Sequence, residues 1–155
     1  MTLAETVLAR AKAKGATVAT AESCTGGMIG AAITDVAGSS AIFDRGYITY
    51  SNEAKIEMLG VSADTLAAHG AVSEEIAREM AEGARRAGAT LSVSVTGIAG
   101  PGGSEFKPEG RVCFGLAQDG APTRTQTVEF GALGRAVVRE KSVEHALRML
   151  IDALT

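Results

Sequence analysis

The stretch that most restricts the fold of this chain is residues 20–27, which read TAESCTGG. Residues 16–19 before it favour a short strand, and residues 28–33 after it are apolar and compatible with a helix. A strand that turns into a helix through Ser, Thr and paired Gly raises a hydroxyl to the end of a sheet, beside the first N–H groups of the helix. The stretch therefore predicts a reaction centre or an anion site, although Ser23 or Thr25 could also serve only as a helix cap.

The hydrophobic periodicity of the rest of the chain predicts alternating helices and strands. Helices are expected over residues 3–14, 28–36, 53–59, 62–66, 74–87 and 133–154, and strands over 16–19, 46–50, 91–96, 112–116 and 123–130. The early strands are separated by helices and the late ones by a hairpin turn at Asp119 and Gly120. We expect one α/β domain over residues 1–155, a three-layer α/β/α sandwich with a mixed, mostly parallel sheet.

Composition and charge exclude several classes of protein. A net charge of −3 argues against nucleic acid as the main partner, and no apolar run reaches the roughly 20 residues that span a bilayer. The chain begins without the basic and apolar segments of a signal peptide, and two cysteines imply no disulfide framework. The two histidines form no metal-ligand spacing. We expect a cytoplasmic protein that contacts neither membrane nor nucleic acid and needs no metal or organic cofactor.

Two further side chains are candidates for chemistry with Ser23. If the first two parallel strands are neighbours, their carboxyl ends meet, and Ser23 faces Tyr50 and Lys55. A lysine accepts the proton of a nucleophilic serine when burial lowers its pKa. A packed aromatic ring and a solvated helix charge are the plainer interpretations of Tyr50 and Lys55. Cys24 is an alternative nucleophile, because a helix start favours a thiolate.

Four motifs occur in order along the chain: ESCTGG at 22–27, TYSNEAK at 49–55, GAVS at 70–73 and TGIAGP at 96–101. In this order and spacing they resemble the C-terminal domain of the competence/damage-inducible protein CinA. The resemblance implies hydrolysis of the carboxamide of nicotinamide mononucleotide, which yields nicotinate mononucleotide and ammonia. It also implies that the Ser–Tyr–Lys set proposed for the family falls on Ser23, Tyr50 and Lys55.

The substrate-binding groups are less sharply defined. Backbone N–H groups around Cys24, Thr25, Gly26 and Gly27 could bind either the oxyanion or the substrate phosphate. The turn at Thr96 and Gly97 could take the remaining role. Arg139 is a candidate phosphate ligand, because the family tends to keep an arginine there, and an exposed helix charge is the plainer reading. Arg45 and Arg111 are weaker candidates.

The glycine-rich loop over residues 97–110 is too long for a simple connector and is expected to be functional. It departs from the family, which commonly has Lys-Pro-Val-Gly where this chain has Lys-Pro-Glu-Gly at 107–110, and it looks about a residue shorter.

Two further expectations concern partners. Apolar surface around residues 58–80 suggests a homo-oligomer, most simply a dimer. The alternative to an enzyme is a non-catalytic protein in which the same turns hold a nucleotide, for instance a competence- or DNA-damage-related partner protein.

Overall fold

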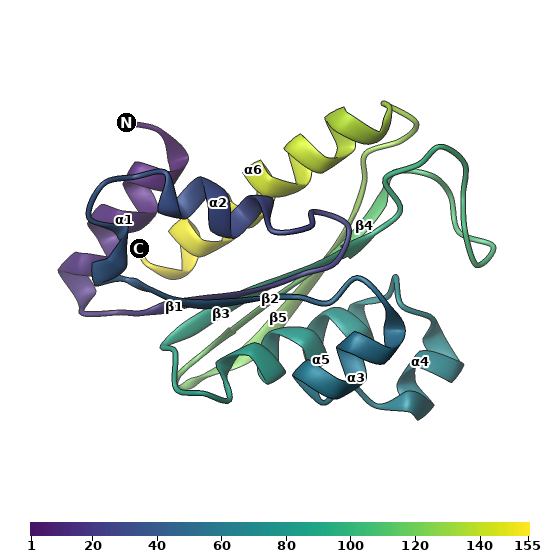
Figure 1. Cartoon of the computed structure of the whole chain (residues 1–155), viewed down its shortest axis with the longest axis horizontal. Helices are drawn as coiled ribbons and strands as arrows, with labels where there is room; N and C mark the ends of the chain where they lie inside the picture. Colours follow the sequence, from purple (N-terminus) through teal and green to yellow (C-terminus); the bar gives the residue numbers. More distant parts are fainter.

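A computed structural model describes residues 1–155 as a five-stranded sheet with helices on both faces. The strands are β1 (Val18–Glu22), β2 (Phe43–Ile48), β3 (Leu91–Gly97), β4 (Arg111–Gln118) and β5 (Ala121–Glu129). The helices are α1 (Leu3–Lys14), α2 (Met28–Thr34), the short 3₁₀ helix η1 (Ser39–Ala41), α3 (Asn52–Leu59), α4 (Ala63–His69), α5 (Glu74–Arg85) and α6 (Arg135–Ala153). Helices α1, α2 and α6 cover one face of the sheet and α3, α4 and α5 the other, so the three-layer sandwich is confirmed (Figure 1).

The sheet has the strand order β2-β1-β3-β4-β5. Strand β1 pairs in parallel with β2 and β3, whereas β4 pairs antiparallel with β3 and β5. The expected mixed sheet is therefore present, with two parallel and two antiparallel pairings. None of the helices is both long and apolar enough to cross a membrane.

The position of strand β2 differs from the expectation by about three residues. It runs over Phe43–Ile48, because its register with β1 begins at Phe43 opposite Val18. Tyr50 consequently lies beyond the strand, in the connection to α3. The last helix begins at Arg135 rather than at Leu133.

Strand β1 lies inside the sheet and is buried along its whole length, with helices packed over both faces. The larger apolar cluster includes Val93, Phe114 and Leu150, and a smaller one includes Ala19, Leu59 and Met80. Packing against both faces fixes β1, and its carboxyl end carries the predicted turn.

Helix α3 is held closely against the rest of the second layer. The Ser51 hydroxyl caps its start by accepting a hydrogen bond from the Ala54 N–H. At its end α3 meets α5 at Gly83, where a Cβ atom would lie only 2.1 Å from the carbonyl oxygen of Leu59. This close approach needs glycine. The contact holds α3 close to α5, and in this position the Lys55 side chain is buried rather than solvated.

Candidate active site

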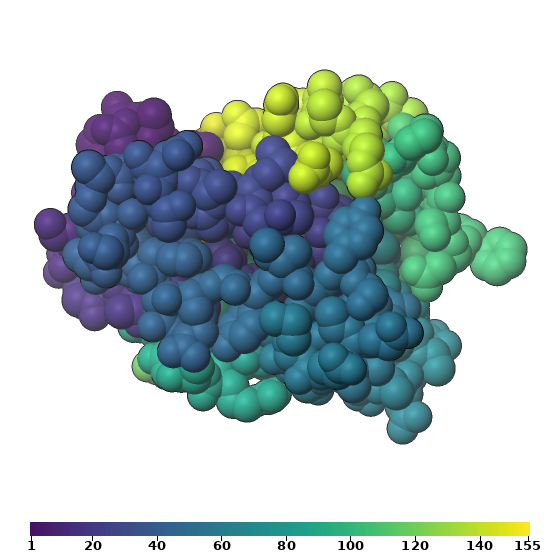
Figure 2. Space-filling view, viewed as in Figure 1, coloured from purple at the N-terminus to yellow at the C-terminus, as the bar shows by residue number.

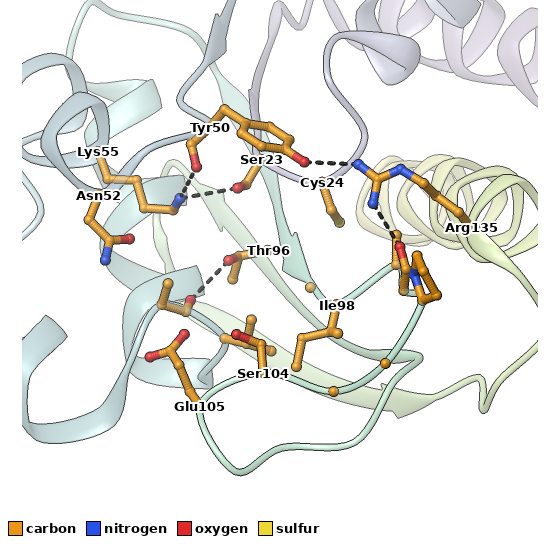
Figure 3. A pocket seen from close by; sticks show the side chains of 18 residues that line it. Ser23, Cys24, Tyr50, Asn52, Lys55, Thr96, Ile98, Ser104, Glu105 and Arg135 are labelled. Atoms are coloured by element: carbon orange, nitrogen blue, oxygen red, sulfur yellow. Dashed lines mark hydrogen bonds between the residues drawn. The ribbon is translucent and has the colours of Figure 1, made fainter.

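Ser23 lies immediately after β1, at the wall of a pocket of about 350 Å³. Its N–H donates to the carbonyl of Val95 on β3, which fixes the start of the turn. Its side chain is 8% exposed and reaches the pocket together with Lys55, Thr96, residues 98–105 and Arg135 (Figure 3). The pocket thus opens at the carboxyl ends of the parallel strands, as in other α/β folds.

Lys55 is 1% exposed as a whole residue, and its amine lies among three oxygen atoms. Its Nζ is 3.1 Å from Ser23 Oγ, 2.9 Å from the carbonyl oxygen of Thr49 and 3.3 Å from that of Tyr50. Carbonyl oxygens only accept hydrogen bonds. A neutral amine therefore donates its two N–H groups to the carbonyls and directs its lone pair at the serine hydroxyl. The same three oxygens accept from the ammonium form, so a proton can be taken up without rearrangement.

Burial changes the pKa of Lys55 and the pKa of the Cys24 thiol in opposite directions. Desolvation lowers the pKa of Lys55, and the negative charge of Glu105 opposes this shift, as a Cys24 thiolate would. Desolvation raises the pKa of the Cys24 thiol to about 11. Burial therefore shifts Lys55 toward its neutral form beside Ser23 and disfavours a Cys24 thiolate.

A buried carboxylate shapes the turn that follows Ser23. Glu22 accepts hydrogen bonds from the Thr25 hydroxyl at 2.6 Å and from the N–H groups of Ile29 and Gly30 at 2.9 and 3.0 Å. Glu22 therefore occupies two of the first N–H groups of α2, which the sequence pattern had predicted to be available to an anion. The N–H groups of Cys24 and Thr25 have no partner within the chain. The Gly27 N–H is also without a partner, so the free donors of this turn are those of Cys24, Thr25 and Gly27.

Arg139 on α6 holds the other side of the same turn. Its guanidinium donates to the carbonyl oxygens of Cys24 at 3.0 Å and Thr25 at 3.3 Å. Because the C=O and N–H of a trans peptide point in opposite directions, the Thr25 N–H faces away from Arg139. In this position Arg139 fixes the peptide planes of the turn and does not line the pocket.

Tyr50 and Arg135 meet at the opposite side of the pocket from Lys55 (Figure 3). The Arg135 guanidinium donates to the Tyr50 hydroxyl at 2.9 Å and to the carbonyl of Gly100 at 2.8 Å. The Tyr50 side chain is 61% exposed and makes no hydrogen bond to Ser23 or Lys55. Tyr50 contacts Lys55 through its main-chain carbonyl instead.

Some of the predicted binding residues line the pocket, and others lie outside it. Cys24, Thr96 and Gly97 line it, and the Thr96 hydroxyl donates to the carbonyl of Ala71. Thr25, Gly26, Gly27 and Arg139 form the supporting turn behind it. Arg45 pairs with Asp44 and Arg111 with Glu129, and neither lines the pocket. No group of His, Cys, Asp or Glu side chains is arranged to hold a metal ion.

Sequence reasoning assigned no role to Glu22, Glu105 or Arg135. A signal existed for Arg135, which stands four residues before Arg139 and so shares its helix face. A signal also existed for Glu22, because a carboxylate just before a helix start can accept from its first N–H groups. Nothing in the sequence indicated that Glu105 faces the pocket, since its direction depends on the fold of a long loop.

That loop, residues 97–110, is held by its own charged side chains. The Glu109 carboxylate accepts from the Gly102 N–H at 2.6 Å. The Lys107 Nζ donates to the carbonyl oxygens of His69 at 2.6 Å and Val72 at 2.7 Å, which ties the loop to the connection between α4 and α5. The glutamate that departs from the family pattern thus closes the loop on itself. The loop projects from the side of the molecule next to the start of α6 (Figure 2).

Comparisons with known proteins agree with this architecture. The chain is 53% identical over 152 residues to the nicotinamide-nucleotide amidohydrolase PncC of Escherichia coli K12, covering 97% of this chain and 92% of that protein. It is 50% identical to a CinA-like protein of Chloroherpeton thalassium, of which it matches only 35% of the length. The crystal structure of the competence/damage inducible protein CihA from Agrobacterium tumefaciens superposes with a TM-score of 0.94 at 46% identity, covering 98% of this chain and 93% of that one.

The family model described as the CinA C-terminal domain matches residues 1–154. The four motifs that carried the resemblance lie at the pocket or beside it: the Ser23 turn, the segment that bears Lys55, residues 70–73 and the loop that begins at Thr96. On the extent of this match and the identity to its relatives, the chain belongs to the CinA C-terminal domain family.

Proposed function

We propose that this protein hydrolyses the carboxamide of nicotinamide mononucleotide to nicotinate mononucleotide and ammonia. The observation that carries the proposal is the contact of 3.1 Å between Lys55 Nζ and Ser23 Oγ at the wall of the pocket. A serine paired with a desolvated amine is a nucleophile with its own base. The name of the PncC relatives, nicotinamide-nucleotide amidohydrolase, supports this choice of substrate.

In the first step Ser23 Oγ attacks the carboxamide carbon. The neutral Lys55 amine accepts the hydroxyl proton through its lone pair, while the Thr49 and Tyr50 carbonyls hold its two N–H groups. The negative charge moves to the amide oxygen. The Cys24 N–H, which has no partner within the chain and belongs to a residue that lines the pocket next to the nucleophile, is the donor assigned to this oxyanion.

Collapse of the tetrahedral intermediate breaks the C–N bond. The Lys55 ammonium returns its proton to the departing nitrogen, ammonia leaves, and an ester remains on Ser23. Lys55 is then neutral again and accepts a proton from a water molecule that attacks the ester. The Lys55 ammonium returns this proton to Ser23 Oγ as the ester C–O bond breaks, which frees the serine and the acid product; one water is consumed for each ammonia released.

The phosphate of the substrate is assigned to the Arg135 side of the pocket. Glu22 already occupies the first N–H groups of α2, and Arg139 is bound to the turn. Arg135 is the one cation that lines the pocket besides Lys55, and its planar donors suit a phosphate. Tyr50 orients Arg135 through its hydroxyl and Lys55 through its carbonyl. A direct transfer from Ser23 to Lys55 then needs no proton relay through the tyrosine hydroxyl.

The test is an ammonia-release assay on nicotinamide mononucleotide with four enzymes: wild type, Ser23→Ala, Cys24→Ala and Tyr50→Phe. We expect Ser23→Ala to lower kcat by at least about three orders of magnitude and Cys24→Ala to keep most activity. Tyr50→Phe should raise KM more than it lowers kcat. Substrate binding by the wild type without ammonia release would instead support the non-catalytic alternative, and an inactive Cys24→Ala beside an active Ser23→Ala would reverse the nucleophile.

A further inference from the structure

A tight turn in the loop carries a carboxylate that the mechanism above does not use. Ser104 and Lys107 exchange both backbone hydrogen bonds, at 3.0 and 2.8 Å, around the two residues Glu105 and Phe106. Both enclosed residues have positive φ, 52° and 64°. This is the geometry of a type I′ turn, which usually takes Asn or Gly at these places. A glutamate held there against its backbone preference suggests a role for its side chain.

The turn directs Glu105 into the pocket and Phe106 away from it. Glu105 is among the lining residues, and its carboxylate lies on the side of Asn52 and Lys55 (Figure 3). Phe106 is fully exposed and does not line the pocket. The Lys107 anchor on the carbonyls of His69 and Val72 fixes the base of the turn. The Glu105 carboxylate forms no ion pair within 4.0 Å, although the Lys107 ammonium lies near it, both charged groups being next to Gly70.

Building on the proposed function, we propose that Glu105 selects substrates whose carboxamide is carried by a positively charged pyridinium ring. The ring nitrogen of such a nucleotide bears a fixed positive charge because it is bonded to the sugar. In the proposed complex the carboxamide is at Ser23 and the ring occupies the part of the pocket that Glu105 lines. An unpaired anion there attracts the cationic ring and does nothing for a neutral one.

The distribution of charge in the pocket supports this assignment. Figure 3 shows Glu105 on the side of Lys55 and Arg135 on the opposite side, with Ser23 near the upper wall between them. A pyridinium mononucleotide has its positive ring beside the carboxamide and its phosphate at the other end, so the two charges match in order. The charge of Glu105 also reaches the reacting end, since it raises the pKa of Lys55 against the effect of burial.

The test compares two substrates that differ in the charge of the ring: nicotinamide mononucleotide and its reduced dihydropyridine form. The measured quantity is the ratio of kcat/KM for the charged over the neutral substrate, relative to wild type, so that intrinsic reactivity cancels. Glu105→Gln removes the negative charge, and Glu105→Asp keeps it on a shorter side chain. Phe106→Gly is the matched control, because it alters the same turn without touching a charge. Dissociation constants of both nucleotides in the Ser23→Ala background give a second readout that is independent of turnover.

We expect Glu105→Gln to lower the preference for the charged substrate about fivefold, through KM, as for a partly exposed ion pair. Glu105→Asp should keep most of the preference, and Phe106→Gly should leave it unchanged. An unaltered ratio in Glu105→Gln overturns the inference, as does an equal loss on both substrates, which assigns the residue to loop shape. A wild type that binds both nucleotides but releases no ammonia refutes the proposed function, while the binding ratio in the Ser23→Ala background still decides the role of Glu105.

Discussion

Replacing Lys55 by methionine tests the proposed base most directly. Methionine fills a similar volume but has no amine, so the change removes the proton acceptor from Ser23 and the donor to the Thr49 and Tyr50 carbonyls. A positioned general base contributes about 10²- to 10⁴-fold to the rate. We therefore expect kcat/KM for ammonia release to fall by at least about 10²-fold. Lys55→Arg should be comparably inactive, because a guanidinium stays protonated at neutral pH.

The dependence of activity on pH is a second test of Lys55 as the base. A lysine with the ordinary pKa of 10.5 would be neutral in only about one molecule in a thousand at pH 7.4. Burial lowers the pKa of Lys55, and each unit raises the neutral fraction about tenfold. Activity should therefore rise with pH through an apparent pKa below 10.5. A Lys55→Met enzyme within about tenfold of wild type would refute this reasoning.

The lowered pKa of Lys55 also makes the stability of the protein depend on pH. Because the folded-state pKa of Lys55 lies below its unfolded value, the unfolded chain binds more protons between the two values. The free energy of unfolding of the wild type, relative to that of Lys55→Met, should therefore increase as the pH rises toward 10.5. Urea unfolding of both proteins at pH 7 and pH 9.5 measures this difference. A difference that stays constant, or that shifts in favour of the variant, contradicts a depressed pKa.

Three further predictions concern phosphate binding, the stability of the Ser23 turn and the oligomeric state. Arg135→Gln should raise KM for the mononucleotide about tenfold and leave the phosphate-free riboside unaffected; an equal change on both would remove Arg135 from phosphate binding. Glu22→Ala should lower the free energy of unfolding by about 2–4 kcal/mol, since it leaves a hydroxyl and two N–H groups unpaired; a urea midpoint equal to wild type would argue against that. Light scattering should find a homodimer, and a monomer at micromolar concentration would count against the expected interface.

Local pattern was enough to predict the order of the elements and to indicate residues 22–27 as a candidate reaction centre. The order of helices and strands follows from hydrophobic periodicity, because the side-chain repeats of helices and strands are properties of short segments. The turn at 22–27 could be recognised for the same reason: a short strand, a serine, paired glycines and an apolar helix are adjacent in sequence.

The sequence could predict the contact between Ser23 and Lys55 only under a condition. It depended on β1 and β2 being parallel neighbours, which the sequence only allowed and the sheet order shows. The close packing of α3 on α5 at Gly83 then decided that Lys55 points inward and is desolvated. Its lowered pKa follows from that burial, which no local pattern determines.

The roles of the two α6 arginines and of Glu105 were decided by tertiary structure alone. Arg135 and Arg139 lie one helical turn apart, and only the position of α6 over the Ser23 turn decides which faces the pocket and which binds carbonyls. Glu105 enters the pocket because Lys107 anchors the loop on residues more than thirty positions earlier. The sequence by itself determined which segments form and where a nucleophile can be raised. The direction of each charge around it depends on contacts between distant segments, which exist only once the layers have packed.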